Sequence, residues 1–222
     1  TALQPDHLQI EPVKLLPGSP LRSDAGELGL RFDPTPPYTV LTTAEMTFEE
    51  IEKLRGMSRL MDLTWNSGHF GTFVEQLAQT CDTPADGLEQ MTRYWHDKGL
   101  FRFPMSRHDL FLRCWDFVCA NWPGEDRSGL KDALAYDYAV CERVNPKRVP
   151  AFFDIKMTTT EQTWVKEQVQ QAVETVKGKG VKLQYFAAIF TALAETGART
   201  LLLFLYRTKS GAGRSTDVLK MG

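Results

Sequence analysis

The spacing of hydrophobic and polar positions predicts helices through the middle of the chain. Between positions 47 and 145, apolar residues recur every three or four positions, as they do on one face of an amphipathic helix. Three of these segments begin at residues that commonly cap helices, Thr47, Thr83 and Ser106. Short loops separate the segments, so the sequence predicts a bundle of five consecutive helices. The predicted core positions include Ile51, Leu54, Met61 and Trp65, then Phe70, Phe73, Val74 and Leu77, then Leu88, Met91 and Trp95, then Leu110, Phe111, Cys114, Phe117 and Val118, and finally Leu130, Ala133, Leu134, Tyr138 and Cys141.

The N-terminal segment has a different pattern. Apolar and polar residues alternate over positions 8–16, which predicts a strand that stops at Pro17-Gly18. Pro12 restricts this strand to a sheet edge or a bulge. A short helix is expected over positions 21–28, and the proline-rich loop at 31–37 indicates a domain boundary.

The C-terminal segment combines a helix with strands. A sixth helix, capped by Thr159-Thr160, is expected to reach about position 176. The apolar runs 181–190 and 199–206 predict a β-hairpin, although 186–195 is rich in alanine and leucine and could equally be helical. The Gly- and Ser-rich stretch 210–215 is expected to be mobile or a hairpin loop.

Composition narrows the class of protein. The chain has 26 basic and 28 acidic residues among 222, and neither end carries a block of like charge, so nucleic acid is not an expected partner. No apolar run approaches the roughly 20 residues that cross a bilayer, so no membrane span is expected. Four cysteines without short metal-binding spacing indicate reduced thiols in a cytoplasmic protein. The first residues, Thr1 to Pro5, lack an initiator methionine and a secretory signal, so we expect a segment of a longer polypeptide.

Motifs for known chemistry are absent from the sequence, which has no nucleophile elbow, zinc motif, phosphate loop or dinucleotide fingerprint. The richest polar cluster is Asp62, Asn66 and His69, with Arg59 and Trp65, near the end of the first bundle helix. These groups are predicted to hold a polar substrate or an adjoining domain, the alternative being that they only cap and solubilise the helix end.

Two further interpretations concern acidic residues. A hydrolase or lyase site built from His69, Asp62 and Asp109 is a weaker hypothesis. The stretch 132–138 is interpreted as a helix with one face in water, because Asp132 and Asp137 lie five apart, which is unsuitable for sharing one proton or ion.

Particular stretches of the sequence resemble those of a known protein family. Positions 8–22, with Leu-Leu-Pro-Gly-Ser-Pro-Leu at 15–21, and positions 36–41 resemble the C-terminal part of cobalamin-binding-domain-containing radical S-adenosylmethionine (SAM) proteins. Phe48-Glu49-Glu50-Ile51 and the run from Asp62 to Phe70 resemble their helical C-terminal domain of unknown function. Members are described as iron–sulfur oxidoreductases or as relatives of the anaerobic magnesium-protoporphyrin IX monomethyl ester cyclase. The resemblance covers residues 8–145 well and the remainder loosely.

The resemblance implies a domain organisation and a fold class. Residues 1–37 would be the last strand and helix of a radical SAM barrel with a linker, 38–148 a helical bundle, and 149–222 a helix with a small β-hairpin. The chain would therefore be mainly α. Val13 and Lys14, at the end of the final barrel strand, would lie close to the adenosyl moiety, unless they merely complete the strand.

The family's chemistry, as the resemblance implies it, needs a CxxxCxxC motif for a [4Fe–4S] cluster that reduces SAM, and a cobalamin-binding domain. Neither motif is in this sequence, so no catalytic residue or cofactor is assigned to it. We expect an accessory domain, a lid, substrate-shaping or docking element, that is inactive without the upstream barrel and cobalamin domain of the same polypeptide. The substrate is an unknown small molecule, a tetrapyrrole being one candidate. The alternative is a self-contained helical module that binds a protein or a small ligand.

Overall fold

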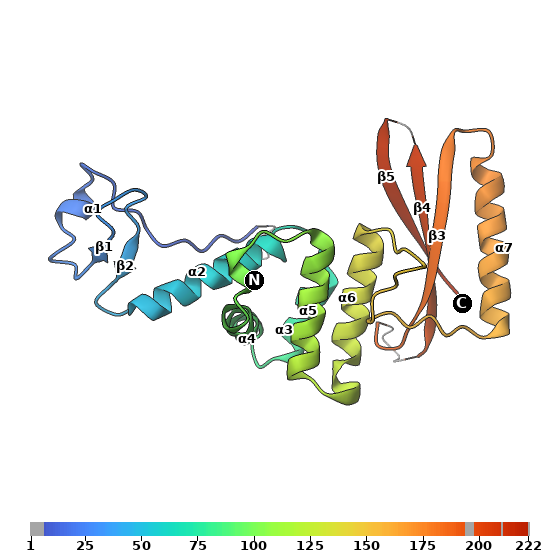
Figure 1. Ribbon diagram of the computed structural model, residues 1–222, viewed down its shortest axis with the longest axis horizontal. Coiled ribbons are helices and arrows are strands. Elements are labelled where there is room, and N and C mark those ends of the chain that lie inside the picture. Colours follow the sequence, from blue (N-terminus) through green and yellow to red (C-terminus); the bar gives the residue numbers. More distant parts are fainter. Residues whose placement is uncertain (1–6, 194–197, 210, 222) are drawn as a thin grey trace, which may run out of the picture. The chain divides into compact units, whose positions relative to one another are not determined.

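The computed structural model describes residues 7–193, 198–209 and 211–221, which form two compact units (Figure 1). The described part of the first unit comprises residues 7–68 and 78–104, and that of the second comprises 69–77 and the described residues from 105 onward. These units divide the chain at other places than the predicted domain borders after residues 37 and 148, and those borders stay a prediction. Each unit is described by itself.

The N-terminal part of the first unit consists of short elements around a small core. Strands β1 and β2 pair in an antiparallel ladder with an irregular register. The elements are α1 (Pro20–Ser23), β1 (Arg31–Phe32) and β2 (Val40–Thr42). The buried core residues are Leu15, Ala25, Val40 and Ile51.

Two predicted elements in this part are wrong in extent. Among residues 8–16, only Lys14 is paired, through an isolated antiparallel bridge to Thr39. Alternation alone does not make a strand, because a strand needs a partner of matching length and β2 is three residues long. The helix predicted over 21–28 is the four-residue α1, since so short a segment does not offset the cost of starting a helix.

Two long helices complete the first unit. They are α2 (Phe48–Leu63) and α4 (Pro84–Asp97), followed by a 3₁₀ turn, η1 (Leu100–Arg102). The predicted capping box is present, with the Thr47 side chain accepting from the Glu50 N–H and the Glu50 side chain accepting from the Thr47 N–H. The expected inward position of Trp65 is wrong, because α2 ends at Leu63 and the indole is 45% exposed.

The helices of the second unit surround an aromatic core. They are residues 71–77 of α3 (Gly71–Thr80), α5 (Arg107–Asn121), η2 (Gly124–Arg127), α6 (Ser128–Cys141) and α7 (Thr159–Val176). The rings of Phe70 and Phe111 stack with their centroids 4.0 Å apart, and both are fully buried. The predicted core positions of α5 are confirmed: Leu110, Phe111, Cys114, Phe117 and Val118 are all buried.

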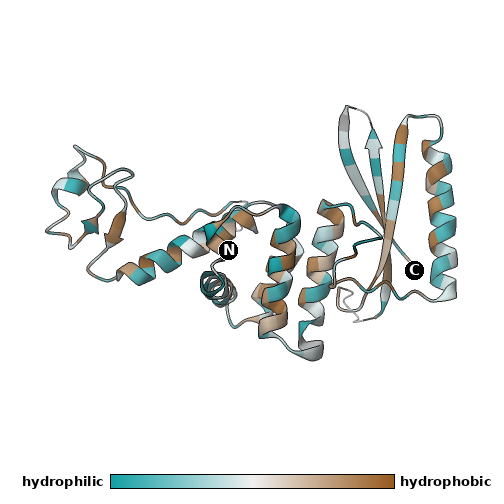
Figure 2. Cartoon of the chain, viewed as in Figure 1, coloured by the Kyte–Doolittle hydropathy of each residue, from teal (hydrophilic) through white to brown (hydrophobic). Residues whose placement is uncertain are grey.

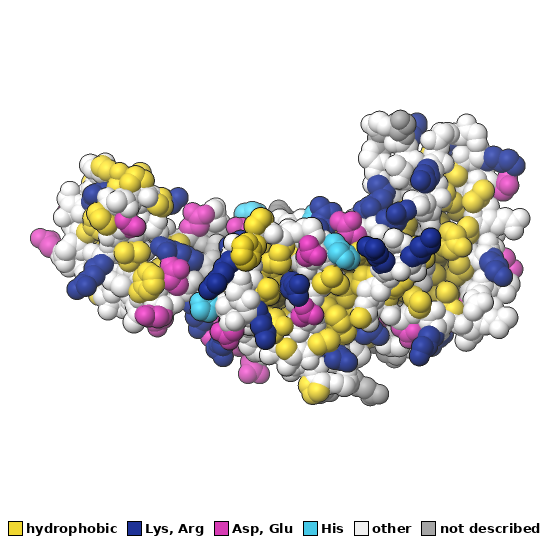
Figure 3. Space-filling model, viewed as in Figure 1, with side chains coloured by type: hydrophobic (Ala, Val, Ile, Leu, Met, Phe, Trp, Pro, Cys, Tyr) yellow, Lys and Arg dark blue, Asp and Glu magenta, His cyan; other side chains and the backbone are white. Residues whose placement is uncertain are grey.

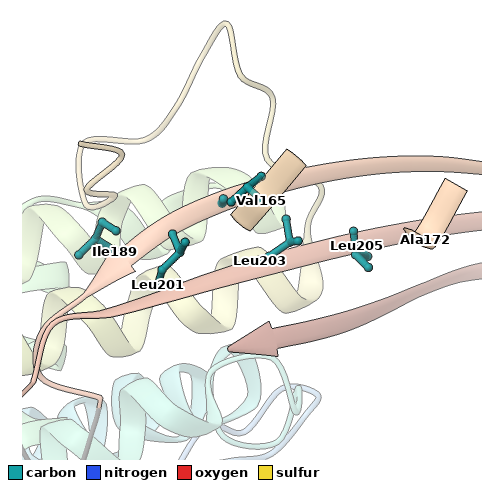
Figure 4. Packing of buried hydrophobic residues seen from close by; sticks show 7 residues of the cluster. Val165, Ala172, Ile189, Leu201, Leu203 and Leu205 are labelled. Atoms are coloured by element: carbon teal, nitrogen blue, oxygen red, sulfur yellow. The ribbon is translucent and has the colours of Figure 1, made fainter. Parts of the chain in front are cut away.

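A three-stranded antiparallel sheet in the order β3-β4-β5 closes the second unit. Its strands are β3 (Val181–Phe190), β4 (Thr200–Lys209) and β5 (Ala212–Lys220). Helix α7 packs on one face of the sheet, where Val165 and Ala172 lie beside Ile189, Leu203 and Leu205 (Figure 4). The cap of α7 is Thr158, one residue before the predicted Thr159-Thr160, and it forms a second capping box with Glu161.

The hairpin prediction is confirmed, and one strand was missed. The helical alternative for 186–195 is wrong over 186–190, which belongs to β3, and positions 194 and 195 lie outside the described residues. The stretch expected as a loop or mobile tail contains the turn at Gly211 and the first residues of β5. Most residues of β5 are polar (Figure 2), so hydrophobicity gave no signal for it. The chain is therefore a mixed α/β protein and not mainly a helical bundle.

Candidate functional site

Val13 and Lys14 lie beside residues 38–40, with exposed side chains. The Val13 carbonyl accepts a hydrogen bond from the Val40 N–H (3.0 Å), and the Leu15 N–H donates to the Tyr38 carbonyl (2.8 Å). The Val13 side chain is 51% exposed, whereas that of Leu15 is fully buried. The backbone of this segment is therefore partly hydrogen-bonded within the first unit. The side chains of Val13 and Lys14, which were predicted to contact a cofactor, lie at the surface of that unit.

Asp62 and Asn66 come together at the C-terminal end of α2. The Asn66 side-chain amide donates to the Leu8 carbonyl (2.8 Å) and to the Asp62 carboxylate (2.8 Å). Its oxygen accepts from the Leu8 N–H (3.0 Å). The Asn66 side chain is thus hydrogen-bonded to both the N–H and the carbonyl of Leu8, as the backbone of a neighbouring strand would be. These bonds fix the N-terminal segment on α2. Within the predicted polar cluster, Asp62 and Asn66 therefore have a structural role, which is to hold the backbone of Leu8.

His69 belongs to the second unit, where it pairs with a cysteine. Its Nδ1 lies 3.5 Å from the Cys141 Sγ, and the thiol also donates to the His69 carbonyl (3.6 Å). Nearby, Arg107 and Glu142 form an ion pair (3.0 Å). We call His69, Arg107, Cys141 and Glu142 the Cys141 cluster. The structure groups His69 with these residues, whereas Asp62 and Asn66 lie in the first unit.

The electrostatics of the Cys141 cluster keep both partners neutral. Burial lowers the pKa of His69, and the positive charge of Arg107 adds to that effect while Glu142 opposes it. Burial also raises the pKa of Cys141, and the charge of Asp137 acts in the same direction. A neutral thiol beside a neutral imidazole is not an activated nucleophile, since the thiolate is the attacking species. The neutral side chains of His69 and Cys141 can still donate and accept hydrogen bonds.

The interpretation of α6 as a helix with one face in water overlooked two buried carboxylates. Asp137 is 7% exposed and accepts the N–H groups of Thr72 (3.3 Å) and Phe73 (2.8 Å) at the start of α3. Asp132 is 2% exposed and accepts the N–H groups of Thr191 and Ala192, the latter at 2.8 Å, just after β3. The expectation of a wet face is wrong for both, because each satisfies unpaired backbone donors of another element. The two carboxylates contact different elements.

Burial also changes the proton affinity of one of these groups. It raises the pKa of Asp137 to about 6, and the hydrogen bonds from Phe73 and Thr72 offset part of this effect. Next to it on α6, the Tyr138 hydroxyl lies 2.8 Å from His108 Nδ1. Asp109, the third member of the hydrolase hypothesis, lies in the first turn of α5, where its carboxylate accepts a hydrogen bond from the hydroxyl of the cap residue Ser106 (2.7 Å). That carboxylate therefore has a structural partner of its own.

A groove lies between α2 and α4 in the first unit, with a volume of about 650 Å³. Its walls include Phe48, Arg55, Arg59 and Phe101. Gly56 allows the two helices to approach closely, since a Cβ there would lie 2.7 Å from the Thr92 methyl carbon. Sequence reasoning missed this groove, and the one available signal was a glycine inside a helical pattern.

Two structural features do not occur among the described residues: a cluster of potential metal ligands and a helix suited to cross a membrane. That part of the chain holds no group of three or more His, Cys, Asp or Glu side chains placed to bind a metal ion. None of its helices has the combination of length and apolarity that a bilayer crossing requires.

Comparison with known proteins identifies a family. Residues 26–192 match the family described as a protein of unknown function (DUF4080), and because the match spans more than half of the sequence, the chain belongs to this family. The matched range ends directly after β3, so β4 and β5 lie outside it. No curated protein matches the sequence. No solved structure matches the fold.

Proposed function

We propose that this chain is the C-terminal accessory domain of a cytoplasmic, cobalamin-dependent radical SAM enzyme, and that it docks against the barrel of that enzyme. The resemblance of positions 8–22 and 36–41 motivates the assignment, and membership of a family of unknown function is consistent with it. SAM, the [4Fe–4S] cluster and cobalamin would be bound by the upstream domains. The substrate would be a small molecule, with a tetrapyrrole as one candidate.

One observation carries the proposal: apolar side chains are exposed on the segment that resembles the end of the barrel. Val13 and Leu16 are 51% and 54% exposed on either side of the buried Leu15, and Leu28 is also half exposed. Figure 3 shows hydrophobic side chains on the surface of this N-terminal part. Exposed apolar groups gathered on one segment mark an interaction surface, and a barrel that continues the chain would cover them.

The predicted site residues have defined roles in this proposal. Val13 and Lys14 would lie at the barrel mouth, near the adenosyl moiety. Asn66 would hold the N-terminal segment in place through Leu8, as it does here, and Asp62 would add a carboxylate beside it. His69 would meet the substrate as a neutral hydrogen-bonding group, consistent with its lowered pKa.

The test is association with the upstream polypeptide. The natural gene should encode a CxxxCxxC motif ahead of Thr1, and a separately produced upstream fragment should bind this chain in a pull-down. Leu16→Glu should weaken that binding at least about tenfold, because it places a charge in an apolar contact. Val173→Glu is the control, since Val173 is 45% exposed on α7 and carries no proposed contact. A gene without the cysteine motif would contradict the proposal, as would equal binding by the two variants.

A second candidate is a self-contained module that binds small organic anions, and the groove between α2 and α4 favours it. The groove combines the aromatic side chains of Phe48 and Phe101 with the cation Arg59, while Arg55 is ion-paired with Glu52, another residue of the lining. Arg59 lies over the Phe101 ring, 5.7 Å from its centroid, and has no carboxylate partner among the described residues. An aromatic anion would fit this chemistry.

The probe for this second candidate is anilinonaphthalene sulfonate, an aromatic anion that fluoresces on binding. Arg59→Ala should reduce the saturable fluorescence of the full chain. Arg102→Ala, which removes an exposed cation of the neighbouring η1, should leave it unchanged. Equal signals from the two variants would exclude the groove as the binding site.

A further inference from the structure

The outer edge of β3 is one of the two edges of the sheet, the other being that of β5. Strand β4 pairs with one side of β3 over its full length, and no strand pairs with the other side among the described residues. One contact exists there: the Ile189 N–H donates to the Asp154 carbonyl (2.7 Å) in an isolated bridge. Backbone groups alternate in direction along a strand, so the N–H groups of Leu183, Tyr185 and Ala187 point to the same outer side as that of Ile189.

These outward backbone groups are unpaired where the edge is accessible. No described group accepts the N–H of Leu183 or Tyr185. Leu183 is partly exposed and Tyr185 is 49% exposed, whereas Ala187 is buried. Residue 154 thus occupies the position of a fourth strand at one end of the edge, and the remaining positions are open. An exposed row of unpaired donors and acceptors is a template for another extended chain.

A groove of about 640 Å³ runs along this edge. Five consecutive residues of β3, from Leu183 to Ala187, line it together with α7 and the segment before α7. Because consecutive side chains of a strand face opposite ways, a groove lined by all five straddles the edge and does not lie on one face of the sheet. We call it the β3 groove. Its apolar lining includes Val144, Met157, Val165, Leu183, Tyr185 and Phe186.

The charges in the β3 groove have one sign. Arg143 and Lys166 line it, and no described carboxylate does. Neither cation forms an ion pair with a described acidic side chain. The groove therefore offers apolar pockets on both sides of a hydrogen-bonding edge and two unpaired positive charges.

We propose that the β3 groove binds an extended, acidic peptide segment of a partner protein as a fourth strand of the sheet. The backbone of the peptide would pair with Leu183 and Tyr185, which supplies affinity, and its alternate side chains would enter the apolar pockets toward α7 and toward Val144. Acidic residues of the peptide would meet Arg143 and Lys166, which supplies charge selectivity. This inference does not depend on the radical SAM proposal.

The test uses labelled seven-residue peptides and the full chain, with binding followed by fluorescence anisotropy. A peptide of alternating valine and glutamate should bind, and one of alternating valine and lysine should bind at least about tenfold more weakly. Methylation of alternate backbone nitrogens in the first peptide should abolish binding, because it removes the donors of the new ladder. Absence of binding by the acidic peptide would overturn the proposal, as would equal binding by the methylated peptide.

Matched variants locate the site. Lys166→Glu should weaken binding of the acidic peptide about tenfold. Lys177→Glu, the same charge change at the end of α7 outside the groove, should leave it unchanged. Tyr185→Pro removes an outward N–H, which an edge strand tolerates, and should abolish binding that Tyr185→Val retains. Equal affinities within either pair would overturn the assignment.

Two measurements keep the inference testable if Tyr185→Pro does not fold. In the unmodified chain, amide exchange of Leu183 and Tyr185 should slow when the acidic peptide is added, and unchanged exchange at both would overturn the proposal. Sedimentation of the free chain should show a monomer. A dimer that the acidic peptide cannot dissociate would mean that a second copy occupies the edge, which would also overturn it.

Discussion

Residues 8–46 and the second unit differ in how completely they bury their apolar side chains. The first segment encloses a small core, with Leu15 fully buried between the exposed Val13 and Leu16. The second unit buries whole rings, among them Phe70 and Phe111, between helices and against a sheet. Apolar residues are present in both regions, so the difference comes from the number of layers that cover them. The second unit supplies its own covering, whereas residues 8–46 leave Val13 and Leu16 exposed, at the surface where we propose that the barrel docks.

The first and second units differ also in their charged groups. Ion pairs of the first unit, such as Lys53 with Glu89 (2.5 Å), lie at the surface, where they contribute little. The second unit buries Asp132 and Asp137 and uses them to hold backbone N–H groups of other elements. Buried carboxylates of this kind fix the positions of segments that are far apart in sequence.

The largest effect is expected from opening the aromatic core of the second unit. Phe111→Ala should lower the free energy of unfolding by about 3–5 kcal/mol, because it removes a fully buried ring stacked on Phe70. Urea unfolding of the full chain measures it. A loss below about 1 kcal/mol would mean that the core is looser than its geometry indicates.

A neighbouring pair of leucines tests the small core of the first unit. Leu15→Ala should destabilise residues 8–46 by about 2 kcal/mol, because Leu15 is fully buried. Leu16→Ala should change their stability by no more than about 0.5 kcal/mol, since Leu16 is 54% exposed. Amide exchange of Leu15 and Val40, whose N–H groups are hydrogen-bonded within the unit, reports the local opening. Similar effects of the two substitutions would show that this segment has no core of its own.

The buried carboxylate of Asp137 should make stability depend on pH. Its pKa is raised to about 6 in the folded chain, so the folded state holds this proton more tightly than the unfolded state. The resulting stabilisation is complete below the unfolded pKa of about 4 and is lost as pH rises through about 6. From pH 4 to 7, the unfolding free energy of the unmodified chain should fall relative to Asp137→Asn by on the order of 1–3 kcal/mol.

A second carboxylate in the same unit should show the opposite sign. The hydrogen bond from Arg199 lowers the pKa of Glu161, so its contribution is present at neutral pH and is lost as pH falls through the lowered pKa. The stability difference between the unmodified chain and Glu161→Gln should therefore shrink on acidification, as followed by urea unfolding at several pH values. Slopes of the same sign for both substitutions would contradict the assigned burial of Asp137.

The smallest effects should be alike in the two units. Thr47 and Thr158 each close a capping box, with Glu50 and Glu161 respectively. Thr47→Ala and Thr158→Ala should each cost about 1 kcal/mol, because each leaves a helix N–H without its acceptor. Thermal unfolding followed by circular dichroism measures both. A cap that matters in one unit alone would show that tertiary packing outweighs the local motif in the other.

The sequence predicted the elements whose signals are strong and local. The caps at Thr47, Thr83 and Ser106 start α2, α4 and α5, and the apolar spacing located the buried face of α5. The hairpin of β3 and β4 followed from two apolar runs of strand length. The alternation of apolar and polar residues over positions 8–16 predicted a strand that does not form. Strand pairing depends on a partner strand, and the pattern of one segment does not reveal whether that partner exists.

The candidate site was less predictable. The pairing of Asp62 with Asn66 follows from their four-residue spacing on α2, but nothing in the sequence indicated that Asn66 binds the backbone of Leu8. The contact between His69 and Cys141 joins residues 72 positions apart. The open edge of β3 was equally hidden, since edge position is a property of the whole sheet.

By itself, the sequence determined where α2, α4 and α5 begin, which face of α5 is buried, and that the chain has a hairpin near its C-terminal end. These features depend on interactions within about four residues or on strict periodicity, both of which are written in the order of side chains. The tertiary structure alone decided that Asp132 and Asp137 are buried, that polar β5 is a strand, and that β3 keeps one edge open. Burial and pairing depend on which distant element supplies the donors, and local sequence does not encode that choice.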